Sequence, residues 1–395
     1  MVATLTQAVR ARTAAAARPP ARRFVPVLPT LSPRMLSPRL RAGPAPFPLA
    51  GAEVRRFYFA RNAVWLAARL LGLSGHEVLV PAYHHGVELE ALEAAGASLA
   101  FVRVDGKMRL DLADLERKIG PRTRALYVIH YLGFPQPMDE IMAIGRRHGL
   151  PVLEDCALAL LSKDGEIPLG ARGDVGIFCL YKSVPVPNGG LLALNRAIDA
   201  PATVRSPPLG STVQHLGGLF LAHVALRYGA GGEALRETVR RTGRAVRFAT
   251  GVHPVATGTM HFDPGCADLG MSAASRLVLE NLDFDEIVAA RRRNWFLLFS
   301  RLRDVAPPVH GELPSGACPL FYPLLCEDKP RVAERLAARG IETVDFWNEG
   351  HPACPVDAFP EVQALRRRVL EIPLHQDLGA DDMAYVAEAV EEALT

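Results

Sequence analysis

The feature that most constrains the fold is a regular alternation of helical patterns and short apolar segments that begins near residue 60. The apolar segments lack the polar alternation of a strand with one solvated face, so they are typical of a parallel sheet covered on both sides by helices. The predicted helices of this part are 62–73, 88–95, 111–119 and 138–148. The predicted strands are 77–81, 98–104, 125–131, 151–154, 175–181 and 190–195. We therefore expect an α/β fold with a mainly parallel sheet flanked by helices.

The remainder of the chain predicts a second, smaller unit. Residues 198–260 are irregular, apart from an apolar run, Leu216–Leu226, for which a buried helix is favoured over membrane contact. A long, kinked helical pattern covers 272–302, with Arg291, Arg292 and Arg293 on a solvated face. The pattern beyond it predicts a small α+β domain, with extended segments at 320–326, 342–347 and 369–373 and helices at 329–339 and 380–394. The expected boundaries are an arm over 1–45, a large domain over 46–280 and a small domain over 281–395.

The N-terminal arm is basic. The first 52 residues contain eight arginines and no acid, and they are rich in Ala and Pro, so we expect no packed structure over 1–45. Arginine dominates the whole chain, which favours a compositional bias over an organellar signal or a nucleic-acid arm. No basic stripe interleaved with aromatic residues follows, so nucleic-acid binding is not expected.

Cysteine usage and hydropathy bound the compartment. The six cysteines form no CxxC pair, which argues against a zinc site and a disulfide framework and favours the cytoplasm. No run approaches 18 apolar residues, so no membrane span is expected.

Lys182 is the most informative single residue. Only five of the 45 basic residues are lysines, and this one stands between an apolar strand and a loop rich in Pro and Gly. Its amine either lies in water at a strand end or, when partly buried, acts as a nucleophile toward carbonyl groups.

Asp155 follows the strand 151–154 in the same way. It either caps the next helix or pairs with a protonated pyridine nitrogen. Enzymes that use pyridoxal 5′-phosphate (PLP) hold the aldehyde as a lysine Schiff base and the ring nitrogen with a carboxylate. Because ligands of open α/β sheets bind at the carboxyl ends of the strands, Asp155 and Lys182 are predicted to flank one cofactor.

A phosphate site and a ring contact are predicted nearby. Arg61 and Asn62 open the first helix, where free N–H groups and a guanidinium favour an anion, although a plain helix start is an equal alternative. One ring of the pair His84-His85 is expected to stack on the cofactor. A metal site at this pair lacks a third ligand in register, so no metal is predicted.

With these motifs in order, residues 56–395 resemble the DegT-type sugar aminotransferases, which are fold-type-I PLP enzymes. The motifs that carry the resemblance are 75–81, 95–97, 130–135, 153–157, 339–343 and 372–375, together with Gly189 and Gly190 at seven and eight residues after the lysine. The resemblance implies that Lys182 is the Schiff-base lysine and Asp155 the ring-nitrogen partner. It also places His85 at the stacking position, and Arg61 and Asn62 at the phosphate site.

Several positions depart from the family pattern. Cys179 stands near the position of a phosphate-binding serine, which Ser183 or Tyr181 would have to replace. The other departures from the usual polar residues are Leu158, Asn188 and Gly270.

The resemblance implies a homodimeric aminotransferase that moves an amino group, with glutamate as donor, onto a keto substrate such as a nucleotide-linked keto sugar. Two alternatives remain open. One is another PLP reaction, such as sugar dehydration, although the similar dehydratases carry histidine in place of the lysine. The other is an inactive relative that serves as a binding or scaffold protein.

Overall fold

The computed structural model describes residues 23–37, 45–50, 53–199, 204–250, 255, 261–345 and 347–395, and only the backbone of residues 246–250. Residues 1–22 and 38–44 of the predicted basic arm lie outside the described residues.

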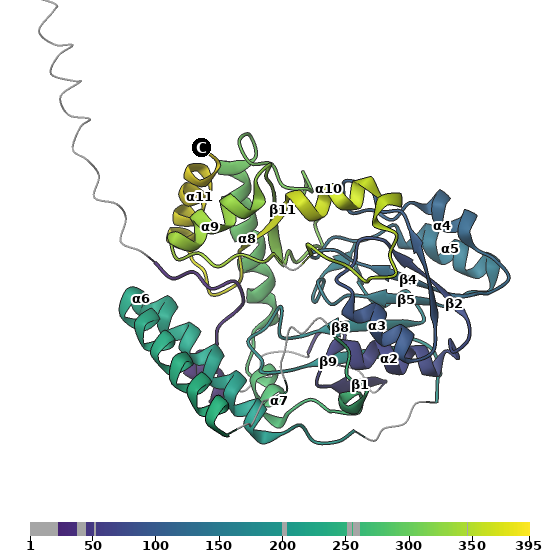
Figure 1. The fold of residues 1–395 in the computed structure, drawn as a ribbon, viewed down its shortest axis with the longest axis horizontal. Coiled ribbons are helices and arrows are strands. Elements are labelled where there is room, and N and C mark those ends of the chain that lie inside the picture. The colour runs from purple at the N-terminus through teal and green to yellow at the C-terminus, as the bar shows by residue number, and fades with distance from the viewer. Residues whose placement is uncertain are drawn as a thin grey trace, which may run out of the picture.

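A seven-stranded sheet forms the centre of the large domain, in the order β1-β9-β8-β5-β4-β2-β3. Five neighbouring strands, β8, β5, β4, β2 and β3, run parallel, and β9 and β1 pair antiparallel at one edge (Figure 1). Every residue of β5, β8 and β9 is buried, which explains why β8 and β9 are apolar throughout. The strands are β1 Val54–Phe57, β2 Glu77–Pro81, β3 Ser98–Val102, β4 Thr123–Ile129, β5 Val152–Asp155, β8 Val175–Cys179 and β9 Gly190–Leu194. The prediction of a mainly parallel α/β sheet is confirmed.

Helices connect the parallel strands. Helix α2 contacts α3 and the strands β8 and β9. Helix α4 contacts both the edge strand β3 and α5, so α4 and α5 lie side by side, away from β1 (Figure 1). A short hairpin of β6 (Lys163–Asp164) and β7 (Ile167–Pro168) lies in the connection from β5 to β8. The helices are α2 Ala60–Leu70, α3 Val87–Ala94, α4 Leu112–Lys118 and α5 Met138–His148.

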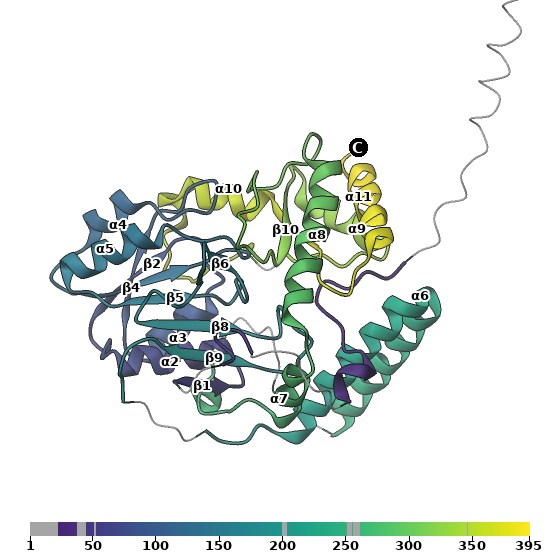
Figure 2. The ribbon, with the colours of Figure 1, turned by 180° about the vertical axis from the view of Figure 1, so that it is seen from behind.

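The C-terminal part contains a two-stranded antiparallel sheet, β10 with β11, and the helices packed on it (Figure 2). Its elements are α8 Phe284–Leu302, β10 Phe321–Leu325, α9 Lys329–Ala338, α10 Pro360–Arg368, β11 Val369–Pro373 and α11 Ala380–Leu394, with the 3-10 turn η3 at Val356–Ala358. The predicted extended segment 342–347 is wrong as a strand, because among its described residues only Val344 pairs, in an isolated bridge with Glu371.

The helical pattern over 272–302 is two helices, α7 (Ala273–Glu280) and α8. Asp283 separates them, and its carboxylate accepts the N–H of Glu286 as an N-cap. The prediction that Arg291 lies on a solvated face is wrong, because it is 1% exposed. It is one helical turn from Ile287 and from Trp295, so it shares their buried face, and its guanidinium donates to the carbonyls of residues 183, 319 and 320.

The described part of the N-terminal arm is packed, contrary to prediction. Val25 is fully buried and forms a parallel bridge with Ile341. The backbone and hydroxyl of Thr30 donate to Asp377 at 2.6 and 2.9 Å. The average composition of the arm concealed a short apolar run, residues 24–31, which continues into the 3-10 turn η1 (Pro33–Leu36). We call residues 24–31 the N-terminal segment.

Residues predicted to be irregular contain the helix α6 (Leu209–Thr250), which lies on one side of the molecule beside the N-terminal segment (Figures 1 and 2). Gly229, with φ of 56° and ψ of −132°, divides it into two helical halves. Residues of both halves, Gln214 and Ala222 from the first and Arg236 and Arg244 from the second among them, line one cavity, so the halves form a hairpin. The helix expected over the apolar run is present, but it is not fully buried, since Phe220 is 41% exposed. The 3-10 turn η2 (Pro264–Cys266) follows.

Among the described helices, none combines the length and apolarity required to cross a membrane.

Candidate active site

The carboxyl ends of β5 and β8 meet at one edge of the sheet. Asp155 is the last residue of β5, and Lys182 lies in the turn that follows β8, its neighbour in the sheet. Both residues line a cavity of about 260 Å³. His85, Arg61 and Cys179 also line it, so the structure brings together five of the seven residues predicted from the sequence.

The other two predicted residues lie outside this lining. Asn62 is fully buried and its side-chain amide donates to the carbonyl of Cys266 at 2.8 Å. Ser183 is buried in the turn after Lys182, where its carbonyl accepts hydrogen bonds from Arg291 and Gln376. Tyr181, the second candidate to replace the missing serine, does line the cavity.

Asp155 is held in a fixed orientation. The hydroxyl of Tyr127 donates to its Oδ2 at 2.6 Å, and the N–H of Ala157 donates to its Oδ1 at 2.8 Å. Burial and the nearby Glu88 raise the pKa of Asp155 to about 6, although Tyr127, Ala157 and Lys182 favour the charged form. At neutral pH the carboxylate is therefore ionised, and it is available to pair with a cation in the cavity.

His85 presents a neutral ring to the same cavity. Burial, together with the positive charges of Lys182, Arg61 and Arg366, lowers its pKa to about 3. The ring meets Trp347 edge to face, with 6.1 Å between centroids. Its neighbour His84 is engaged elsewhere, since its ring nitrogens contact the carbonyl of Pro81 at 3.0 Å and the N–H of His351 at 2.7 Å.

An anion would fit at the start of α2. Phe59, the N-cap residue, supplies no side-chain hydrogen bond to the first turn. Arg61 lies in that turn, with its guanidinium 3.9 Å from the centroid of the Phe59 ring and its side chain in the cavity lining. Cys179 lines the cavity too, and burial raises the pKa of its thiol, so it is an uncharged, weak donor.

Sequence reasoning missed several residues of the site. Glu88 lines the cavity from α3, and its carboxylate accepts the N–H of His85 at 2.9 Å. Tyr127 is the Asp155 partner on the adjacent strand β4, and Trp347 closes the cavity from the C-terminal part. Val27 and Leu28 form a wall from the N-terminal segment. Only Tyr127 carried a signal, since a polar hydroxyl within a buried strand needs a partner.

The cavity suits PLP on the chemistry of its donors. It offers an amine for an aldehyde, a carboxylate for a ring nitrogen, an arginine at a helix start for a phosphate, and a neutral aromatic ring for stacking. Its volume is near the lower limit of small-molecule sites, roughly 300–1,000 Å³.

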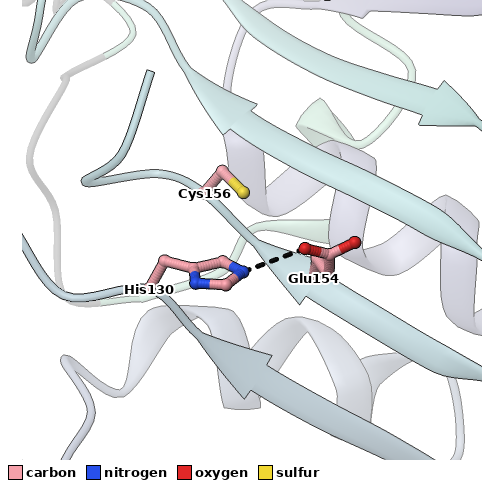
Figure 3. Close-up of side chains that lie close together, drawn as sticks. All are labelled: His130, Glu154 and Cys156. Atoms are coloured by element: carbon pink, nitrogen blue, oxygen red, sulfur yellow. Dashed lines mark hydrogen bonds and ion pairs between the residues drawn. The ribbon is translucent and has the colours of Figure 1, made fainter. Parts of the chain in front are cut away.

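A second polar cluster consists of His130 and the two residues that flank Asp155 in the sequence, Glu154 and Cys156 (Figure 3). His130 Nδ1 accepts the N–H of Gln136, so its Nε2 carries the proton and donates to Glu154 at 2.9 Å. The carboxylate of Glu154 also accepts N–H groups of residues 170, 172 and 173. Although burial alone would raise the pKa of Glu154, these hydrogen bonds hold it below its usual value. The protein itself satisfies both nitrogens and both oxygens, so the cluster fixes the end of β5.

Asn188, one of the departures from the family pattern, has a structural contact. Its Oδ1 accepts the N–H of Ser272 at 2.9 Å, and the Ser275 hydroxyl donates to its backbone carbonyl at 2.7 Å. The residue thus ties the loop before Gly189 to the start of α7.

The fold and the cavity define an α/β protein with a lysine and an aspartate at neighbouring strand ends, and comparison with known proteins agrees with this class. Residues 60–200 match the DegT/DnrJ/EryC1/StrS aminotransferase family. The chain is 27% identical over 338 residues to UDP-N-acetyl-3-dehydro-α-D-glucosamine 3-aminotransferase of Acidithiobacillus ferrooxidans, covering 84% of this chain and 82% of that protein. It is 34% identical over 258 residues to L-glutamine:scyllo-inosose aminotransferase of Streptomyces griseus, covering 63% of this chain and 52% of that protein.

The fold agrees as well. The solved structure of the sugar aminotransferase CalS13 from Micromonospora echinospora superposes with a TM-score of 0.62 at 21% identity, covering 93% of this chain and 100% of that one. Residues 60–200 are thus similar to the DegT/DnrJ/EryC1/StrS aminotransferase family, and the chain as a whole is similar to sugar aminotransferases.

Proposed function

We propose that this chain is a PLP-dependent aminotransferase that transfers an amino group from an amino acid, glutamate by family resemblance, to a keto sugar. The observation that carries the proposal is the presence of Lys182 and Asp155 in one cavity, at neighbouring strand ends. The names of the relatives support a sugar acceptor, since one acts on a UDP-linked amino sugar precursor and another on scyllo-inosose. A nucleotide-linked keto sugar is therefore the acceptor that we propose.

The residues have distinct roles in this proposal. When bound, PLP supplies an electron sink for the carbon that loses its proton. Lys182 would hold the aldehyde through its amine and, once displaced, carry a proton to and from the substrate carbon. The carboxylate of Asp155, ionised above pH 6, would keep a proton on the ring nitrogen. Arg61 and the first turn of α2 would hold the phosphate, and the neutral ring of His85 would stack on the pyridine.

The remaining assignments rest on the sequence. A homodimer follows from the family resemblance, and mass measurement in solution would test it. A cytoplasmic location is a further proposal, supported by the six cysteines, all of which carry free thiols.

The test is a visible absorption spectrum of the purified protein with added PLP. The wild type is expected to gain the absorbance of PLP bonded to a lysine amine and to lose it when glutamate is added. Lys182→Ala should lack this absorbance. Lys163→Ala removes an exposed lysine outside the cavity, so it is the matched control and should behave as the wild type.

The other outcomes distinguish the alternatives. A bound cofactor that ignores every amino donor would indicate another PLP reaction. A protein that takes up no PLP would indicate a non-catalytic binding relative, and it would overturn the proposal.

A further inference from the structure

A second cavity, of about 1,140 Å³, adjoins the active site. It lies between the two halves of α6, the N-terminal segment and the loop at Val186-Pro187. Val27, Leu28 and Tyr181 line both cavities, so the two spaces share a wall and are neighbours. The second cavity exceeds the roughly 300–1,000 Å³ of a typical small-molecule site, so it can receive a substrate much larger than a simple keto acid.

Helix α6 lies outside the part of the chain that the family model matches. The family match covers residues 60–200, and α6 begins at Leu209. The lysine, the aspartate and the helix start of the active site lie inside the matched part. The walls contributed by α6 lie outside it, where determinants of substrate choice are expected.

The second half of α6 presents a row of arginines to the cavity. Arg236, Arg240 and Arg244 are spaced four residues apart, so they lie on one face of the helix, and all three line the cavity. Arg236 pairs with Glu342 at 2.9 Å, and Arg244 contacts Glu237 at 3.2 Å. Among the charged lining residues there are three arginines and one glutamate, so the lining has a net charge of +2.

The rest of the lining is largely apolar near the active site, with Val27, Leu28 and Leu219 among the lining side chains. A ligand that extends from Lys182 into this space would therefore meet apolar side chains and a separate arginine row. Guanidinium groups form paired, charge-assisted hydrogen bonds with phosphate oxygens. An uncharged ligand would not neutralise the net positive charge of the lining.

We infer that the hairpin α6 forms the second half of the acceptor site, and that Arg240 and Arg244 bind a phosphate or diphosphate group on the part of the acceptor remote from its keto carbon. This inference rests on the proposed aminotransferase function, because that function places the keto carbon at Lys182. It assigns the recognition of the anionic group to an element outside the family match.

The test is a calorimetric titration of the PLP-loaded protein with inorganic pyrophosphate. Arg240→Gln and Arg244→Gln are each expected to weaken binding at least 10-fold. Arg241→Gln removes the same charge from the same helical turn, but Arg241 is 73% exposed and does not line the cavity, so a change below about 3-fold is expected. The visible absorbance of bound PLP checks that each variant is folded.

Three results would overturn the inference. They are the absence of pyrophosphate binding to the wild type, equal losses in Arg240→Gln and Arg241→Gln, and binding that depends on Arg61 but not on Arg240. Failure of the proposed function is a separate result, since a wild type without PLP uptake can still be titrated with pyrophosphate. If pyrophosphate binding to that protein is weakened by Arg240→Gln but not by Arg61→Gln, the second cavity is the anion site.

Discussion

Replacement of Asp155 by asparagine should stabilise the cofactor-free protein and weaken cofactor binding. Asparagine has the same shape, and its amide can satisfy both contacts, with Oδ1 accepting from Ala157 and Nδ2 donating to the oxygen of Tyr127. The substitution therefore removes the buried charge with little other change.

The magnitude follows from the pKa. Burial raises the pKa of Asp155 from 3.8 to about 6, so the folded state holds this proton more tightly than the unfolded chain does. The stabilising effect of the proton is complete below pH 3.8 and is lost as the pH rises through about 6. At about 1.4 kcal/mol per pKa unit, the ionised carboxylate costs about 3 kcal/mol at pH 7 and about 1.5 kcal/mol at pH 5. Asp155→Asn should avoid this cost.

The assay is urea unfolding of the cofactor-free wild type and Asp155→Asn between pH 5 and pH 8. The variant should have the higher free energy of unfolding at every pH, and its advantage should grow with pH. Added PLP should reduce or cancel this advantage at pH 7, because loss of a hydrogen bond to a charged group costs about 1.5–3 kcal/mol, or about 10- to 100-fold in affinity.

The reasoning fails if the cofactor-free variant is less stable than the wild type at pH 7. It fails in a different way if the variant binds PLP as tightly as the wild type does, since Asp155 would then not pair with the ring nitrogen. Asp164→Asn, on the β6–β7 hairpin outside the cavity, is the matched control and should show neither effect.

Two further variants probe groups around the site. Tyr127→Phe removes a hydrogen bond that favours the ionised form of Asp155, so the pH below which PLP binding is lost should move upward, and an unchanged pH profile of PLP absorbance would contradict this. Burial raises the pKa of Glu371 on β11 to about 8, so its ionised form destabilises the folded protein. Glu371→Gln should therefore raise the free energy of unfolding by about 2 kcal/mol at pH 6 and about 5 kcal/mol at pH 9. A difference in the free energy of urea unfolding that does not grow with pH would refute this reasoning.

The sheet and the pairing of Asp155 with Lys182 at its edge were accessible from the sequence. A wholly buried parallel strand is apolar along its length, so each strand was visible, and the polar residue at its end marked the edge where ligands bind. The prediction that Asp155 and Lys182 flank one cofactor required the strands that precede them to be neighbours in the sheet, and β5 and β8 are neighbours.

Other parts of the site depend on contacts that a local pattern does not contain. Ser183 and Tyr181 were the two candidates to replace the missing phosphate-binding serine, and of the two only Tyr181 lines the cavity. Arg291 was placed in solvent because buried guanidinium groups are rare. Arg291 donates to backbone carbonyls of loops that are distant in the sequence, and no local sequence pattern predicts such contacts.

Only the apolar run Leu216–Leu226 of the hairpin α6 was predicted to be helical, and the rest was missed. Its apolar residues and its arginines are interrupted by glycines, so no continuous helical period emerged over 198–260. The N-terminal segment was missed because the composition was averaged over residues 1–52. The arginine, alanine and proline residues of that stretch dominate the average, and the eight residues 24–31 change it little.

The docking of the N-terminal segment has a consequence for biosynthesis. Val27 and Leu28 leave the ribosome early, yet the backbone and side chains that hold this segment belong to residues 340–342 and 375–377, near the end of the chain. The wall that these two residues contribute therefore depends on contacts made more than 300 residues further along the chain, so a chain truncated before residue 340 is expected to have an open cavity.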